Sequence, residues 1–344
     1  NPETNAAHCC GHHAQMAGIF GAALALTVPE IAEKLGGQVV FFATPAEEYG
    51  EIEFKNQLRE QGKIRYGGGK CELIRTGAFD DIDLCLAHHI QPGDEIQVGS
   101  GTGNGFVSKV IRYLGKAAHA AGAPDKGVNA LSAASLGLQA LGLNRETFRD
   151  EDCVRVHPII TKGGNLVNVI PDEIVIETLV RAKTIEAFTD AAKKTDRSFQ
   201  AGAVAMGAKV EITTLPGYLP TLAEQALPEL KRAAELAAPE VPVREAAGHS
   251  GGSTDVGDVQ HLMPVYTFNT GGVKGGLHQI NFEVTNEEEA YIDTAKMFAL
   301  AAYGLLKEKA ARSKELVKNY KPVFKDSAEY TKFMEQFDSK EVLD

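Results

Sequence analysis

Six consecutive residues near the start of the chain, His8-Cys9-Cys10-Gly11-His12-His13, carry five side chains that bind metals or protons. They stand just before an apolar segment with helical spacing. A second group, Pro45-Ala46-Glu47-Glu48, follows a strand-like run. A thiolate, an imidazole and two carboxylates are the donors of a catalytic divalent-metal site, in which one carboxylate binds the ion and another moves a proton. The two groups together predict a catalytic metal centre.

Each of these residues also has a structural interpretation. Cys10 and His12 are two positions apart and can reach the same ion, but an isolated cysteine usually packs as a small hydrophobic residue. Exposed loop glutamates are equally common. Adjacent carboxylates such as Glu47 and Glu48 are costly beside a buried strand unless a cation offsets their repulsion. Their joint occurrence therefore favours one glutamate as ligand and its neighbour as general base.

Four further histidines are candidates. His88 and His89 end a second strand-like run, and because strand side chains alternate, at most one of them should face the metal. His278 lies in a glycine loop after a third run, where a plain loop histidine is the alternative. His119 stands among small residues, which suit either close approach to a ligand or an ordinary turn.

Two other polar residues could bind a substrate. The guanidinium of Arg181 can hold a carboxylate with two hydrogen bonds, and Asn168 is a neutral donor. Both could equally be structural. The Gly251–Asp255 segment contains Ser253 but no G-x-S-x-G motif, so serine catalysis is disfavoured. No G-x-G-x-x-G follows a strand, which argues against a zinc oxidoreductase.

The elements that position these residues follow from periodicity. Apolar spacing predicts a helix over His13–Leu35, closed by Gly36-Gly37. Continuous apolar runs predict buried parallel strands at Gln38–Ala43, Asp83–Ala87 and Pro264–Asn269. Functional side chains follow each run, as expected for the carboxyl ends of strands in an α/β sheet.

The middle of the chain has a different pattern, with elements in the order βαββαβ. They are expected at Phe106–Leu114, Asn129–Leu143, Val154–Thr161, Glu173–Ala182, Ile185–Met206 and Lys209–Thr214. This order predicts a four-stranded α+β unit over residues 105–214 that interrupts an α/β domain made of residues 1–104 and 215–310. Residues 311–344 are expected to form a peripheral helical tail.

Composition narrows the functional classes. The 344 residues carry a net charge of -11 with no basic run, which argues against nucleic acid or membrane as a partner. No apolar stretch is long enough to span a bilayer, and nothing resembles a signal peptide. The five cysteines are odd in number and two are adjacent, which favours a reduced, cytoplasmic setting.

Taken together, the motifs resemble those of the co-catalytic metallopeptidases related to aminoacylase and carboxypeptidase G. The similarity is strongest to their amidohydrolase branch, which contains aminobenzoyl-glutamate, N-acyl-amino-acid and auxin-conjugate hydrolases. It covers nearly the whole chain before the tail. The matching motifs are H-x-C-G-H at His8–His12, P-A-E-E at Pro45–Glu48, D-x5-H ending at His89, G-K-x-x-H-A-A at Gly115–Ala121, N-x-I-P-D at Asn168–Asp172, and G-S-T-D-V-G-D at Gly252–Asp258.

The resemblance implies hydrolysis of the amide bond of an N-acyl amino acid, a dipeptide or an aminobenzoyl-glutamate-like substrate by a metal-activated water. It implies Glu47 as general base and one or two ions, Zn²⁺ or Mn²⁺. The implied ligands are Cys10, His12, Glu48, His89 and His278. The α+β unit would be a lid and homodimerisation domain, in which His119, Asn168 and Arg181 bind the substrate's carboxylate or the oxyanion, partly across the dimer.

The chain departs from the family pattern in two ways. His13 replaces the usual Asp or Asn. Family members also carry a longer segment before the first motif, so the catalytic domain is expected to lack its N-terminal part. The alternative function is therefore a metal- or partner-binding homologue without turnover.

Overall fold

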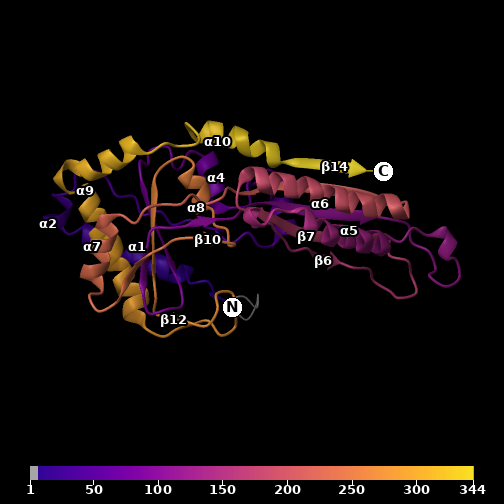
Figure 1. Ribbon diagram of the computed structural model, residues 1–344, viewed down its shortest axis with the longest axis horizontal. Helices are drawn as coiled ribbons and strands as arrows, with labels where there is room; N and C mark the ends of the chain where they lie inside the picture. The colour runs from indigo at the N-terminus through magenta and orange to yellow at the C-terminus, as the bar shows by residue number, and fades with distance from the viewer. Residues whose placement is uncertain (1–6, 344) are drawn as a thin grey trace.

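The computed structural model describes residues 7–343, which form an α/β part and an elongated α+β unit that extends from it (Figure 1). We use the name lid for this unit, which contains residues 105–218 and a strand from the end of the chain. The α/β part contains a four-stranded sheet in the order β1-β11-β2-β9. These strands are β1 (Cys85–Ile90), β11 (Val265–Thr270), β2 (Ile96–Val98) and β9 (Val243–Glu245). Strands β1 and β11 are parallel, with Cys85 opposite Val265 and Ile90 opposite Thr270. Their carboxyl ends therefore lie side by side.

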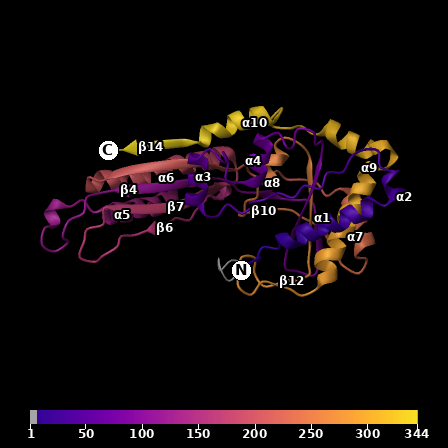
Figure 2. The same ribbon diagram turned by 180° about the vertical axis from the view of Figure 1, so that it is seen from behind.

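Helices cover this sheet. Helix α1 (His12–Leu26) packs along α9 (Thr294–Asn319), and α9 also packs against α7 (Pro228–Ala237). Figure 2 shows α1, α7 and α9 grouped at one end of the molecule. The α/β part also contains shorter helices and strands: α2 (Pro29–Ala32), α3 (Ile52–Glu60), α4 (Gly69–Arg75), α8 (Val256–Gln260), β3 (Thr102–Gly103), β10 (His249–Ser250), β12 (Val273–Lys274) and β13 (Glu283–Val284).

The lid is a six-stranded sheet with two helices on one face. Its central strand β4 (Gly105–Leu114) lies between β7 (Glu173–Ala182) and β8 (Lys209–Tyr218), antiparallel to both. The short strands β5 (Arg155–Val156) and β6 (Ile159–Lys162) both pair with β7. Helices α5 (Ala130–Asn144) and α6 (Ile185–Met206) pack closely together, since a Cβ at Gly202 would lie 2.2 Å from the Ala133 carbonyl oxygen.

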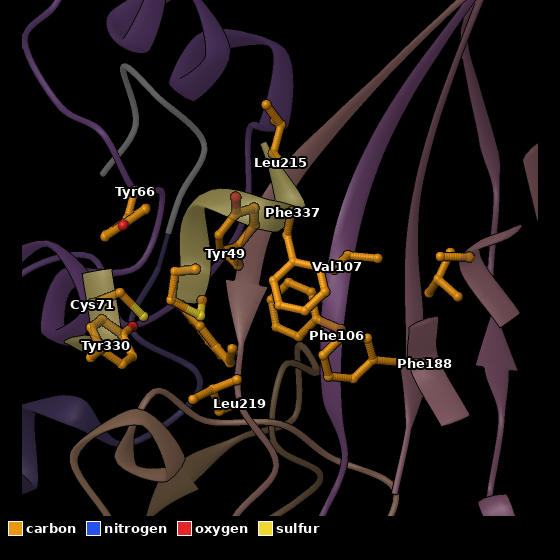
Figure 3. Packing of buried hydrophobic residues seen from close by; sticks show 14 of the residues in the cluster. Tyr49, Tyr66, Cys71, Phe106, Val107, Phe188, Leu215, Leu219, Tyr330 and Phe337 are labelled. Carbon is orange, nitrogen blue, oxygen red and sulfur yellow. The ribbon is translucent and has the colours of Figure 1, made fainter. Parts of the chain in front are cut away.

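A shared apolar core joins the two parts (Figure 3). Tyr49, Phe106 and Tyr218 form a cluster of edge-on ring contacts, with centroids 4.7–5.5 Å apart. Such contacts stabilise aromatic clusters beyond the area they bury. Because Phe106 is the second residue of β4 and Tyr218 the last of β8, this core fixes the base of the lid on the α/β part.

The end of the chain links the two parts a second time. After a kink at residues 307–310 in α9, residues 320–343 form what we call the C-terminal strap, which contains α10 (Ser327–Met334) and β14 (Ser339–Leu343). β14 pairs with β8 and becomes the sixth strand of the lid sheet. The sequence suggested a purely helical tail, and this expectation is wrong. The tail supplies a strand to the lid sheet that the periodicity of the sequence did not reveal.

Most predicted elements are present, but the α+β unit has six strands instead of the expected four, because the predicted strand Val154–Thr161 is divided into β5 and β6 and because β14 joins the sheet. Strand β7 and helix α6 have the predicted bounds. The predicted strand Gln38–Ala43 is wrong: within the described chain, no backbone hydrogen bond joins these residues to a neighbouring segment, and a strand requires such a partner. The helix expected over His13–Leu35 stops at Leu26, and a separate turn of helix starts at Pro29. No described helix is long and apolar enough to cross a bilayer.

Candidate active site

The candidate site lies where β1 and β11 end and α1 begins. Cys10 and His12 flank Gly11, whose φ of 90° is in the left-handed region that glycine tolerates. A Cβ at Gly11 would lie 2.0 Å from a side-chain carbon of Ile90, the last residue of β1. Glycine thus allows the start of α1 to approach the end of the sheet, which brings Cys10 next to His89.

The five predicted metal ligands converge on one point. The Cys10 Sγ lies 3.5 Å from His89 Nε2 and 3.1 Å from His278 Nε2. Glu48 Oε1 lies 3.3 Å from His12 Nε2 and 3.2 Å from His278 Nε2. Overlapping groups of three donor atoms lie within 4.8 Å of one another. Side chains that are far apart in sequence therefore form one compact cluster of sulfur, nitrogen and oxygen donors.

Glu47 stands beside this cluster, with Oε2 3.5 Å from His12 Nε2. The residue before it, Ala46, has a φ of 54°, and its carbonyl accepts a 3.1 Å hydrogen bond from the Gly69 amide. The hydroxyl of Tyr218 donates to the Glu47 carbonyl. Burial raises the pKa of the Glu47 carboxyl, and the nearby Asp255 raises it further. Such an environment suits a proton-accepting carboxylate.

The donor cluster is strongly polarised. Contacts with Cys10 and Glu48 raise the pKa of His12 to about 11, while contact with His12 lowers the pKa of Glu48 to about 2. Burial raises the pKa of the Cys10 thiol. A protonated His12 would form an ion pair with Glu48, whose Oε1 lies 3.3 Å from His12 Nε2. A bound cation replaces that proton, because metal ligands must be deprotonated.

The structure distinguishes the two adjacent histidines. The ring of His88 is buried, its Nε2 lies 2.8 Å from the Thr270 hydroxyl, and burial lowers its pKa well below the usual value. The ring of His89 points to the cluster through Nε2, while its Nδ1 lies 2.6 Å from the Ile90 carbonyl oxygen. That contact favours a proton on Nδ1 and leaves Nε2 available as a ligand.

The donors fit a transition-metal ion. Thiolate, imidazole and carboxylate are the usual ligands of Zn²⁺, and the short separations between the five donor atoms are those expected around one or two ions. Gln15, one helical turn after His12, accepts at 2.7 Å from His12 Nδ1, a contact that fixes the orientation of a ligating imidazole.

The three predicted lid residues lie in different places. Arg181 lies at the base of the lid, where Nη1 donates to the Ser253 hydroxyl at 2.8 Å and the guanidinium covers the Phe106 ring. His119 and Asn168 lie beyond the opposite end of β4, where His119 pairs with Val169. Leu114 is eight residue steps along β4 from Phe106, which corresponds to roughly 26 Å. His119 and Asn168 therefore do not join the cluster of their own chain.

Three residues near the cluster were missed by the sequence analysis as functional residues: Gln15, Lys70 and Asp255. The position of Gln15, three residues after His12 on the same helical face, was an available signal. Asp255 belongs to a motif that the sequence showed, but its partner Lys70 lies 185 positions away. Nothing local in the sequence connects them.

Comparison with known proteins places the chain. The family model described as Peptidase family M20/M25/M40 matches residues 2–303. The mouse Xaa-Arg dipeptidase is 28% identical over 325 residues, which are 92% of this chain and 67% of that protein. The N-acetyl-L-cysteine deacetylase of Bacillus subtilis is 31% identical over 182 residues, 51% of this chain and 38% of the relative. One of the p-aminobenzoyl-glutamate hydrolase chains of Escherichia coli is 30% identical over 176 residues, 51% of this chain and 32% of the relative.

Solved structures show the same fold. A dinuclear metal-binding peptidase of the M20 family from Bacillus subtilis superimposes with a TM-score of 0.56 at 23% identity, covering 87% of this chain and 73% of the other. An aminobenzoyl-glutamate utilization protein from Klebsiella pneumoniae superimposes with a TM-score of 0.57 at 20% identity, covering 83% and 66%. Both matches extend over most of the chain and so include the α/β part and the lid.

Proposed function

Because this chain belongs to peptidase family M20/M25/M40, whose curated relatives are hydrolases of C–N bonds, we propose that it hydrolyses the amide bond of an N-acyl amino acid, dipeptide or aminobenzoyl-glutamate-like substrate. One observation carries the proposal: five donor residues that are far apart in the sequence and the half-buried Glu47 lie together in one cluster. A homologue that had lost turnover would have no need to retain Glu47 beside the metal donors, so the inactive alternative is not favoured.

Each residue has a role in this proposal. Cys10, His12, Glu48, His89 and His278 would hold one or two divalent ions, Zn²⁺ or Mn²⁺. When bound, such ions supply Lewis-acid polarisation of the amide carbonyl and acidify water. Glu47 accepts the proton of the attacking water on its carboxylate and returns it to the leaving amine. Arg181, at the base of the lid, binds the substrate's carboxylate through its guanidinium.

The position of His119 supports a homodimer. His119 and Asn168 are too far from their own cluster to act there, so in this proposal His119 of the partner subunit stabilises the oxyanion. In the described lid sheet, β14 forms one edge, and β5 and β6 form the opposite edge. On that second edge, the side chain of Ile159 in β6 is 61% exposed. Beside Asn168, the side chain of Val167 is fully exposed. An apolar sheet edge and loop of this kind are suited to contact with a second copy.

The test is a hydrolysis assay on a panel of N-acyl amino acids, dipeptides and aminobenzoyl-glutamate, with added Mn²⁺ or Zn²⁺. Glu47→Gln should keep its metal and lose kcat by roughly 10²–10⁴-fold, because it removes only the proton acceptor. Glu48→Gln should instead lose metal, measured by elemental analysis after dialysis. Absence of metal-dependent hydrolysis across the panel would refute the proposal, and near-normal turnover of Glu47→Gln would refute the role of Glu47.

A further inference from the structure

An ion pair with a buried carboxylate, Lys70–Asp255, lies close to the candidate catalytic glutamate. The side chain of Asp255 is fully buried, and its Oδ1 lies 2.6 Å from Lys70 Nζ. Its other oxygen, Oδ2, accepts a 2.9 Å hydrogen bond from the Lys70 backbone amide. One carboxylate therefore fixes both the side chain and the main chain of Lys70.

Lys70 is joined to the loop that carries Glu47. The preceding residue, Gly69, donates its amide to the Ala46 carbonyl at 3.1 Å. Ala46 has a left-handed φ of 54°, which is strained for a residue with a side chain and persists only where surrounding contacts impose it. A Cβ at Gly69 would lie 1.7 Å from the Pro45 carbonyl oxygen, so the two segments are in direct backbone contact.

We propose that Lys70 and Asp255 are positioning residues that hold the Glu47 carboxylate in place through Gly69 and Ala46. This inference rests on the role proposed above for Glu47. Gly69 and Lys70 are consecutive, so a shift of Lys70 displaces the donor that holds Ala46, and Ala46 sets the direction of the next side chain. A displacement of about 1 Å at a reacting group can lower a rate about 100-fold.

A purely structural role is the competing explanation, and the lid supplies a matched control. Lys109 also pairs with an aspartate, its Nζ lying 2.8 Å from Asp196 Oδ1, although its side chain is more deeply buried than that of Lys70. It also donates to the Thr214 hydroxyl. This pair connects β4 to α6 and has no contact with the Glu47 loop. Removing either lysine leaves a carboxylate without its cation, so both losses should destabilise the fold.

The experiment compares Lys70→Met, Asp255→Asn and Lys109→Met with the unmodified protein. Lys70→Met and Asp255→Asn should keep full metal content and a KM within about threefold, while kcat falls about 10–100-fold. Lys109→Met should lower the melting temperature but keep kcat. An unchanged kcat in both Lys70→Met and Asp255→Asn overturns the inference, as does an equal loss of kcat in Lys109→Met.

Hydrogen exchange in the metal-free protein gives a readout that needs no activity. In peptides covering residues 66–72, the Gly69 and Lys70 amides should exchange about tenfold faster in Lys70→Met and Asp255→Asn, and at the normal rate in Lys109→Met. If the unmodified protein hydrolyses nothing, the proposed function fails and exchange alone decides whether the pair holds the loop. Unchanged exchange refutes the inference whatever the activity. Asp255→Asn serves if Lys70→Met does not fold.

Discussion

Replacing Asp258 with asparagine should make the protein more stable at alkaline pH. The Asp258 side chain on α8 is fully buried, where Oδ1 accepts a 2.8 Å hydrogen bond from the Tyr330 hydroxyl of the C-terminal strap. The Leu219 amide lies 3.2 Å from Oδ2. Burial is the largest influence and raises the pKa of the Asp258 carboxyl to about 8, with a further increase from Asp255.

The direction of the effect follows from proton binding. An aspartate in the unfolded chain titrates near 3.9. Between pH 4 and 8 the folded protein therefore holds a proton on Asp258 that the unfolded chain has released. The contribution of the protonated Asp258 to the free energy of unfolding is fully present below about pH 4. This contribution falls as the pH rises and levels off above about pH 8. Each pH unit corresponds to about 1.4 kcal/mol, so about 5.6 kcal/mol is the upper bound across these four units.

The assay is denaturant unfolding of the two proteins at half-unit steps from pH 5 to 9. Asp258→Asn keeps an oxygen acceptor for Tyr330 and a neutral side chain at every pH. Its free energy of unfolding minus that of the unmodified protein should rise with pH and level off near pH 8. The exposed Asp125, replaced by asparagine, is the control and should show no such slope. A difference between Asp258→Asn and the unmodified protein that stays constant from pH 5 to 8 would refute the reasoning.

Two further predictions concern the lid. Arg181→Ala should raise KM roughly 10–100-fold for carboxylate-bearing substrates and change kcat less, because a charge-assisted hydrogen bond contributes about 1.5–3 kcal/mol. Steady-state kinetics with amidated and free-acid substrates test this prediction. A normal KM for the free acid would contradict it. Mixing Glu47→Gln with His119→Ala should restore up to about a quarter of normal activity, because random exchange gives half mixed dimers with one complete site each; no recovery after demonstrated subunit exchange would place His119 outside its partner's site.

Much of the local structure could be predicted from the sequence. Helix α6 and strand β7 have the predicted bounds because each has a continuous periodic pattern and clear flanking residues. The approach of His89 to His278 was also predictable, because they follow β1 and β11, whereas Glu48 joins them although the strand expected before it does not form. Residues at the carboxyl ends of neighbouring parallel strands share one edge of a sheet, and their types match the donor set of a metal ion.

Pairing between distant segments was not predictable from local pattern. Residues 38–43 have the composition of a buried strand, yet a strand forms only where a neighbour accepts and donates its hydrogen bonds. The reverse holds for β14, whose side chains are mostly exposed and carry no apolar alternation, so its pairing with β8 left no sequence signal. In both cases the partner strand, not the segment itself, decided the outcome.

The sequence motifs identify which residues are able to bind a metal or move a proton, but the contacts that these residues make depend on the tertiary structure. His88 and His89 are the same residue type and cannot be distinguished in the sequence. The orientation of the strand buries His88 and directs His89 toward the cluster. His119 belongs to a motif, as the metal donors do, but it lies beyond the far end of β4, one strand length from the cluster. Lys70 and Asp255 meet because α4 and α8 pack together. Donor chemistry is a property of single residues, whereas distance and burial are properties of the packed chain.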